Sequence, residues 1–296
     1  MKILLLGQNG QLGQALYQTL PQLGKVIATT RKQINLENLK DIPNQLKSIQ
    51  PDIIINAAAY TNVDQAEIEQ EKAFIINAKA PAILAQYCKQ QNIPLIHYST
   101  DYVFDGTKKE PYIETDTPNP LNFYGKSKLL GEQAIQEQQG TYLIFRTSWV
   151  YSHEGHNFPN TILKLAQSKK ELHIIQDQWG VPTHVDQLSK ITLKCIPQLK
   201  LNKQLSGLYH LTPKGKTNWY ELASLVIENT PNLNNTTVLP IQAKDYPSKT
   251  TRPQNSLLNT EKIEKHFDLQ LEDWMVYLNQ FNQHKNNKIK LNGTTA

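Results

Sequence analysis

The sequence predicts an α/β fold built on a doubly wound parallel sheet, and three observations lead to this prediction. Short, almost wholly apolar runs recur along the first half of the chain, as expected of strands that are buried on both faces. Stretches long enough for helices separate these runs, and such alternation is typical of parallel sheets. No internal repeat or low-complexity segment interrupts the pattern.

The first strand and the turn after it carry the most specific motif. A strand is expected over residues 2–6 and a helix over residues 11–20. Gly7 allows the tight turn, Gly10 lets the backbone approach a pyrophosphate at the helix N-terminus, and Gly13 lets the helix pack closely on the strand. The spacing G-x-x-G-x-x-G directly after the first strand therefore predicts a Rossmann-type dinucleotide site.

Further elements continue the alternation up to Tyr151. Strands are expected over residues 25–28, 52–56, 94–99 and 141–146, and helices over residues 64–91, with a reset near residue 80, and 127–138. The small residues at 57–59 leave room for a flat cofactor beside the backbone. Thr100 and Asp101 follow the fourth strand, at the carboxyl edge where open α/β sheets place their chemistry.

The end of the second strand bears on the choice of coenzyme. In dinucleotide folds an acid there binds the ribose 2′-hydroxyl, whereas an Arg accommodates a 2′-phosphate. Here Thr30 is followed by Arg31 and Lys32, with no acid. We therefore favour NADP over NAD, while the alternative, that both cations are solvated loop charges, stays open.

The composition changes after Tyr151, which suggests a second unit. Helices are expected over residues 158–167, 185–196, 217–228 and 271–281, and strands over residues 172–175 and 207–211. We expect a dinucleotide-binding domain over residues 1–151, to which later segments return. Residues 152–282 are expected to form mainly a smaller lobe that covers the sheet and holds the substrate, and residues 283–296 a polar, frayed tail.

A tyrosine and a lysine four residues apart suggest acid–base chemistry. Tyr124 and Lys128 share a face if the segment is helical. A cation favours phenolate, so the pKa of the phenol is expected to move down, and Tyr124 can pass a proton to or from a substrate oxygen. Taken alone, the pair also fits a surface helix with a lysine stem lying along it.

Composition and charge exclude several classes of protein. The formal net charge of +5 is too diffuse to indicate a nucleic-acid partner. Cys88 and Cys195 have no metal-ligand spacing, so no metal site follows, and a reducing compartment fits best. The opening apolar run is too short for a signal peptide, and no run approaches membrane-spanning length. We expect a cytoplasmic protein with no membrane partner.

With these motifs in place, the chain resembles the extended short-chain dehydrogenase/reductases, and within that superfamily it most resembles the dTDP-4-dehydrorhamnose reductase family. The resemblance covers residues 1 to about 274. The motifs that carry it are residues 7–13, 56–64, 97–104, 121–128 and 146–151 and the pair Arg252-Pro253.

The resemblance implies a reaction and three catalytic residues. Members of this family reduce the C4 ketone of dTDP-4-dehydro-L-rhamnose to dTDP-L-rhamnose, a precursor of bacterial cell-surface polysaccharide. The coenzyme implied is NADPH, with NADH as an alternative, and the nicotinamide delivers hydride to C4. By resemblance, Thr100 hydrogen-bonds the C4 oxygen, Tyr124 donates the proton, and Lys128 lowers the tyrosine pKa and holds the nicotinamide ribose.

The resemblance also implies binding residues. Asp101 is expected to touch the sugar, and Trp149 to offer the deoxyhexose an apolar face, with a core tryptophan as the alternative. Arg252 is a candidate for the nucleotide diphosphate, with a surface salt bridge as the alternative. The residues expected to bind the cofactor are Gly7, Gly10, Gln11, Leu12, Gly13, Thr30, Arg31, Ala59, Tyr60, Thr61, Tyr98, Tyr124 and Lys128.

The chain departs from the family pattern in two respects, the magnesium ligands and the residue at the adenosine ribose. Relatives use a glutamate two residues past the third glycine, together with a second glutamate, to bind magnesium at a dimer interface. Here those positions are Ala15 and Asp186, so we expect no magnesium site and leave a homodimer open. Thr30 lies where some relatives carry an acid that contacts the adenosine ribose, which leaves the coenzyme preference open.

Three other functions fit the same motifs less well. A 4,6-dehydratase needs adjacent acidic residues after the threonine, but Asp101 is followed by Tyr102. A 4-epimerase would retain its NAD and show no net turnover of added coenzyme. A binding module is the alternative from another class, since the regulatory subunit of methionine adenosyltransferase resembles this family and binds NADP. The complete set of Thr100, Tyr124 and Lys128 favours an enzyme.

Overall fold

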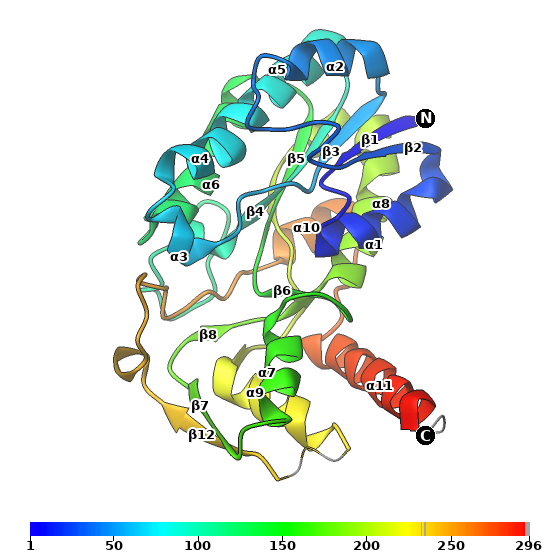
Figure 1. The fold of residues 1–296 in the computed structure, drawn as a ribbon. Coiled ribbons are helices and arrows are strands. Elements are labelled where there is room, and N and C mark those ends of the chain that lie inside the picture. The colour runs from blue at the N-terminus through cyan, green and yellow to red at the C-terminus, as the bar shows by residue number, and fades with distance from the viewer. Residues whose placement is uncertain (232, 234, 294–296) are drawn as a thin grey trace.

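A six-stranded parallel sheet forms the centre of the larger lobe (Figure 1). The computed structural model describes residues 1–231, 233 and 235–293. The strand order is β10-β5-β4-β3-β1-β2, and every neighbouring pair is parallel. The strands are β1 (Lys2–Leu6), β2 (Lys25–Thr29), β3 (Ile53–Asn56), β4 (Leu95–Thr100), β5 (Tyr142–Thr147) and β10 (Gly207–His210). The order reverses between β1 and β3, and the predicted doubly wound α/β fold is confirmed.

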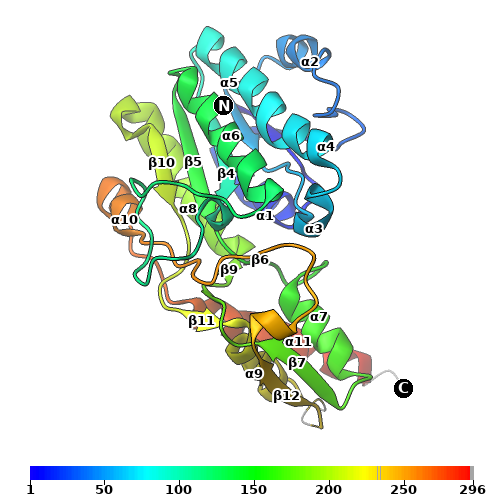
Figure 2. The same ribbon diagram turned by 90° about the vertical axis from the view of Figure 1, so that its left-hand side faces the viewer.

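Helices cover both faces of this sheet (Figures 1 and 2). One face carries α2 (Ile42–Ile49), α5 (Ala80–Gln91) and α6 (Phe123–Glu137), and the other carries α1 (Gln11–Thr19), α8 (Val185–Leu201) and α10 (Glu261–Phe267). Strand β1 explains the arrangement, because successive side chains of a strand point to opposite faces. Ile3 and Leu5 pack in the core with α1 and α8, whereas Leu4 and Leu6 pack with α2 and α5.

The smaller lobe has a hydrophobic core of its own (Figure 2). It contains α7 (Phe158–Ala166), α9 (Trp219–Glu228), α11 (Trp274–Gly293) and the parallel pair β7 (Glu171–Ile175) and β12 (Thr237–Ile241). Two short pairs complete it: β6 (Val150–Tyr151) with β9 (Thr183–His184), and β8 (Trp179–Gly180) with β11 (Thr217–Asn218). The later segments α8, β10 and α10 pack on the larger lobe.

The segment predicted as a long helix over residues 64–91, with a reset near residue 80, is divided into several pieces, and the last of them begins at Ala80. These are α3 (Val63–Ala66), α4 (Gln70–Phe74), a π-helical turn (Ile75–Lys79) and α5. Pro81 lies in the first turn of α5, where its missing N–H costs little. Short 3₁₀ turns occur at Leu20–Leu23, Asp101–Val103, Lys203–Leu205 and Ala243–Asp245.

Several predicted helix boundaries were wrong. Helix α8 ends at Leu201 rather than at residue 196. Helix α6 begins at Phe123 rather than at residue 127, because Asn122 caps it by accepting a hydrogen bond from the Gly125 N–H at 2.8 Å. Helix α11 does not end at residue 281 but continues to Gly293, so residues 283–293 of the predicted frayed tail are helical. Buried Leu278 and Phe281 anchor its first half, and an anchored helix extends at little cost. Residues 294–296 lie outside the described residues.

Within the described part of the chain, none of the helices combines the length and apolar character that crossing a bilayer requires.

Candidate active site

A cavity of about 1160 Å³ opens at the carboxyl ends of β1, β3, β4 and β5. Ligands of open α/β sheets bind at this edge, near the point where the strand order reverses. The second lobe contributes to its wall through Glu154, Gly155, His156 and Trp219. The loop that carries the first three is tied to α1, because Ser152 Oγ and Asn157 Nδ2 each donate a hydrogen bond to Gln11 Oε1 at 2.7 Å.

The glycine turn fits a pyrophosphate. Gly7 has φ +85°, and a Cβ on Gly13 would lie 2.0 Å from the Gly7 carbonyl oxygen, so the chain itself requires glycine at both positions. At Gly10, which lines the cavity, a Cβ would meet only Gly7 O, at 3.4 Å. No side chain caps α1 at Gly10. The first N–H groups of this nine-residue helix are therefore available to an anion in the cavity.

The expected adenosine end of the cavity holds one charge that the prediction missed. Thr30 and Arg31 line the cavity as predicted, and so does Glu37. Arg31 is ion-paired with Glu37 on an exposed stretch. The end of β2 thus lacks an acid, but the following loop brings a carboxylate to the guanidinium. The sequence alone could not indicate this pair, because its members are six positions apart in a loop.

The segment after β3 is fixed to helix α6 by one buried amide. Ala59, Tyr60 and Thr61 line the cavity. Asn77 Oδ1 accepts from the Tyr60 N–H at 2.8 Å, and Asn77 Nδ2 donates to Tyr60 O at 3.0 Å and to Ser127 Oγ at 2.9 Å. The cofactor-facing backbone and the helix with Tyr124 are therefore held in register.

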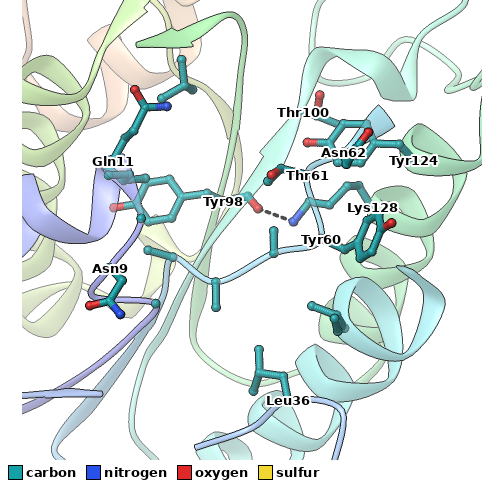
Figure 3. Close-up of a pocket in the computed structure, with 18 of the residues that line it drawn as sticks. Asn9, Gln11, Leu36, Tyr60, Thr61, Asn62, Tyr98, Thr100, Tyr124 and Lys128 are labelled. Carbon is teal, nitrogen blue, oxygen red and sulfur yellow. Dashed lines mark hydrogen bonds between the residues drawn. The ribbon is translucent and has the colours of Figure 1, made fainter. Parts of the chain in front are cut away.

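The three predicted catalytic residues lie on one side of this cavity (Figure 3). Lys128 is only 1% exposed, and its Nζ donates to the Tyr98 carbonyl oxygen at 2.6 Å. The Thr100 hydroxyl donates to Asp101 Oδ1 at 3.0 Å and accepts from the Tyr102 N–H at 3.1 Å. Tyr124 is half-buried beside them.

The expected lowering of the tyrosine pKa was wrong. Burial raises the pKa of Tyr124 to about 12, although hydrogen bonding with Thr100 acts in the opposite direction. Burial also lowers the pKa of Lys128 to about 8, against the charge of Glu132, which favours the ammonium. The cost of desolvating phenolate outweighs the help of the Thr100 hydrogen bond, and the negative charge of Asp101 raises the pKa of Tyr124 further. Tyr124 is therefore a neutral phenol near pH 7, in the form that donates a proton.

The predicted substrate-binding residues divide into two groups. Asp101 and Trp149 line the cavity, but Arg252 does not. Arg252 Nη2 is paired with both carboxylate oxygens of Asp64, each at 3.1 Å. Burial raises the pKa of Asp101 to about 6, and hydrogen bonding with Ser256 and Thr100 lowers it.

Trp149 is held in an unusual backbone conformation. Its φ is +45°, which is rare for a bulky residue and typical of functional sites. Its ring stacks on Trp219 with centroids 3.5 Å apart, and a Cβ on Gly180 would lie 2.5 Å from its indole. The ring is thus packed between a helix and a strand of the second lobe while it borders the cavity.

Of four other predicted cofactor residues, Gln11, Leu12 and Tyr98 line the cavity and Gly13 does not. Gly13 packs on Gly7 rather than lining the cavity, and Leu12 lines it. Tyr98 lines it too, with its hydroxyl 2.7 Å from Thr192 Oγ1 of α8. Gln11 lies opposite Tyr124 in the view of Figure 3.

The positions considered for magnesium carry different groups. Ala15 is buried in α1 and offers no ligand atom. Asp186 lies with His153 and His184, and one ligand atom of each is within 4.8 Å of the others. Magnesium prefers oxygen ligands, so two imidazoles and one carboxylate do not suit it.

Several residues that support the site had no predicted role. Arg146 of β5 and Glu132 of α6 form a buried ion pair at 2.6 Å, and Ser99 also donates to Glu132. Asn56 and His97 form a chain of contacts that ends at Lys128. Polar residues within apolar strands were the available signal, but only the fold shows that their side chains meet.

Comparisons with known proteins agree on one family. The model of the RmlD substrate binding domain matches residues 1–286. The chain is 45% identical to the dTDP-4-dehydrorhamnose reductase of Escherichia coli (strain K12) over 287 residues, 93% of this chain and 95% of the relative. It is 39% identical to the spore coat polysaccharide biosynthesis protein SpsK of Bacillus subtilis (strain 168), over 89% of this chain and 91% of the relative.

A solved structure is similar throughout. It is the dTDP-4-dehydrorhamnose reductase from Bacillus anthracis str. Ames in complex with NADP. The TM-score is 0.88 and the identity 34%, with 95% of this chain and 98% of that chain covered.

Proposed function

We propose a reaction for this chain from the family to which it belongs, the dTDP-4-dehydrorhamnose reductases, whose family model is the RmlD substrate binding domain. The chain reduces the C4 ketone of dTDP-4-dehydro-L-rhamnose to dTDP-L-rhamnose with NADPH. One observation in this structure supports the proposal most directly. Thr100, Tyr124 and Lys128 meet on the wall of a cavity whose other end is a glycine turn suited to a pyrophosphate. A hydride donor and a proton donor are both needed to reduce a ketone, and this cavity has a place for each.

The residues divide the reaction between them. NADPH, when bound, supplies the hydride that adds to C4. Tyr124 donates its phenolic proton to the ketone oxygen, which becomes the C4 hydroxyl. Its pKa of about 12 keeps the proton available at neutral pH. The Thr100 hydroxyl hydrogen-bonds the same oxygen, and the Lys128 ammonium stabilises the phenolate left on Tyr124.

We assign the cofactor to the carboxyl edge of the sheet, because the groups there suit its phosphates. The α1 N-terminus and the backbone at Gly10 would bind the pyrophosphate. Arg31 would bind the 2′-phosphate once its ion pair with Glu37 is broken. The NADP in the Bacillus anthracis relative supports this choice. The other predicted cofactor residues that line the cavity are Gln11, Leu12, Ala59, Tyr60, Thr61, Tyr98, Tyr124 and Lys128.

The substrate is assigned to the side of the second lobe. Asp101 and Trp149 border the cavity near Tyr124 and contact the sugar. Arg252 Nη2 lies 3.1 Å from Asp64 Oδ1 in an ion pair. Arg252 therefore binds the nucleotide diphosphate only if this ion pair is broken. We propose residues 152–282 as mainly a substrate lobe, and they add Glu154, Gly155, His156 and Trp219 to the cavity wall.

Coenzyme oxidation tests the proposal. Purified protein is mixed with NADPH or NADH and with dTDP-4-dehydro-L-rhamnose made in place by the upstream enzymes, and absorbance is followed at the nicotinamide band. Rapid, substrate-dependent oxidation and formation of dTDP-L-rhamnose are expected. Firm NADPH binding without oxidation would reject the proposal. It would favour another 4-keto sugar, a 4-epimerase with retained NAD, or an NADP-binding regulatory subunit.

A further inference from the structure

His97 lies directly behind the catalytic lysine and outside the cavity. It is a fully buried residue of β4, between Asn56 of β3 and Lys128 of α6. Its Nδ1 is 3.1 Å from Asn56 Nδ2, and its Nε2 is 3.3 Å from Lys128 Nζ. The imidazole therefore joins a backbone-anchored amide to the lysine.

The orientation of Asn56 determines which ring nitrogen carries hydrogen. Asn56 Oδ1 accepts from the Ala58 N–H at 3.2 Å, and a flipped amide would set two donors against each other. The Asn56 NH₂ group thus faces His97 Nδ1, which must be the bare, accepting nitrogen. Burial and the charge of Lys128 keep the pKa of His97 well below its usual value, so the ring is neutral. A neutral ring with bare Nδ1 carries its hydrogen on Nε2.

This tautomer points an N–H at Lys128. An ammonium has no lone pair, so it cannot accept from the Nε2–H, whereas a neutral amine can. The Tyr98 carbonyl oxygen, at 2.6 Å from Nζ, accepts from either form. The contact with His97 therefore opposes the charged lysine.

We propose that His97 is a positioning residue that acts through Lys128: oriented by Asn56, its Nε2–H disfavours the ammonium and lets the lysine exchange its proton near neutral pH. Its catalytic consequence rests on the proposed function. After Tyr124 has given its proton to the ketone oxygen, a lysine that releases a proton readily helps to restore the phenol for the next turnover.

Other charged groups around the lysine act differently. Glu132, one turn along α6, favours the ammonium, but its carboxylate is already shared with Arg146 of β5 and Ser99 of β4. Tyr124 on the same helix and Asp101 after β4 border the same cavity. Of these groups and His97, only the imidazole directs a donor at Nζ among the described contacts.

Nitrogen-15 NMR of the histidine rings tests the tautomer without substrate or coenzyme. Long-range proton–nitrogen correlations separate the protonated ring nitrogen from the bare one. The His97 signals, assigned by their loss in H97N, are expected to show a protonated Nε2 and a bare Nδ1 between pH 6 and pH 8. A protonated Nδ1 would overturn the proposal.

Titration of Lys128 tests the consequence. Its side-chain NMR signals are assigned by Lys128→Arg and followed against pH in wild type and two variants. H97N removes the Nε2–H. N56D, nearly isosteric, places an acceptor opposite Nδ1, so the ring carries its hydrogen on Nδ1 and Nε2 becomes an acceptor. Both are expected to raise the lysine titration midpoint by roughly one pH unit, about the worth of a hydrogen bond to a charged group. H210N is the matched control, since His210 is a buried histidine of β10 with no contact to Lys128.

The outcomes separate this inference from the proposed function. An unchanged Lys128 midpoint in both H97N and N56D, or an equal rise in H210N, would overturn it. If either variant fails to fold, the wild-type tautomer decides. A protein that does not oxidise NADPH would reject the proposed function, but the tautomer and the titration would still be read from the protein alone.

Discussion

Arg146 Nη2 lies 2.6 Å from Glu132 Oε2, and the two side chains are 3% and 1% exposed. This buried ion pair joins β5 to the helix that carries Tyr124 and Lys128, one turn beyond the lysine. It fixes the position of α6 relative to β5.

Glu132→Gln is therefore expected to destabilise the protein strongly. It leaves the Arg146 charge buried without a counterion, which typically costs about 3–5 kcal/mol. Urea unfolding measures the change. Lys214→Gln is the control, because Lys214 pairs with Glu264 at 2.9 Å on the surface with 53% of its side chain exposed, and exposed pairs contribute about 0–1 kcal/mol. Equal losses in the two variants would contradict the role given to burial.

Tyr124→Phe is expected to lower kcat by roughly 10²–10⁴-fold, the usual contribution of a positioned acid. The variant keeps the ring and loses only the transferable proton, so NADPH binding, followed by fluorescence titration, should stay near the wild-type value. Tyr17→Phe, at an exposed position of α1, is the control and should retain activity. Loss of NADPH binding in Tyr124→Phe would mean that the hydroxyl has a structural role.

The rate of ketone reduction should have a maximum between about pH 6 and pH 8. The pKa of Lys128 is lowered to about 8, so its cation disappears as the pH rises through that value and kcat/KM falls. The pKa of Asp101 is raised to about 6, so its carboxylate is lost as the pH falls through that value, and the charged acceptor of the Thr100 hydroxyl becomes a weaker, neutral one. D101N should remove the acid limb and keep the alkaline one. An acid limb that persists in D101N would assign it to another group.

Arg31→Gln is expected to weaken NADPH binding by roughly tenfold or more, because a guanidinium–phosphate hydrogen bond is worth about 1.5–3 kcal/mol. NADH binding should change little, since NADH lacks the 2′-phosphate. Lys32→Gln is the neighbouring control, because Lys32 does not line the cavity. Equal losses for both coenzymes in Arg31→Gln would argue against a 2′-phosphate contact.

Two glycine variants separate folding from cofactor binding. Gly13→Ala places a Cβ where Gly7 O is 2.0 Å away, so the backbone must shift and the melting temperature should fall. Gly10→Ala meets only Gly7 O, at 3.4 Å, so its melting temperature should stay near wild type. Its methyl group faces the cavity, however, and should weaken coenzyme binding. A stable Gly10→Ala protein with normal NADPH affinity would contradict the pyrophosphate position.

Sequence alone determined the features that depend on local pattern. Apolar runs such as residues 2–6 are strands because both of their faces must be buried, and the glycines at 7 and 13 occupy positions where a Cβ has no room. The sequence also placed Thr100, Tyr124 and Lys128 in the site, since strand ends and helix spacing are local properties. It located the Rossmann-type sheet and the family for the same reason.

Only the tertiary structure decided what depends on burial and on partners far apart in sequence. The pKa of Tyr124 moves up rather than down, because desolvation, which spacing does not reveal, exceeds the effect of the hydrogen bond with Thr100. Arg252 is paired with Asp64 across 188 positions of sequence. Asn56, Ala58 and His97 set the surroundings of Lys128 through two strands and a helix that meet only in the folded chain. Charges and hydrogen bonds act over a few ångströms of space, and the order of residues does not give those distances.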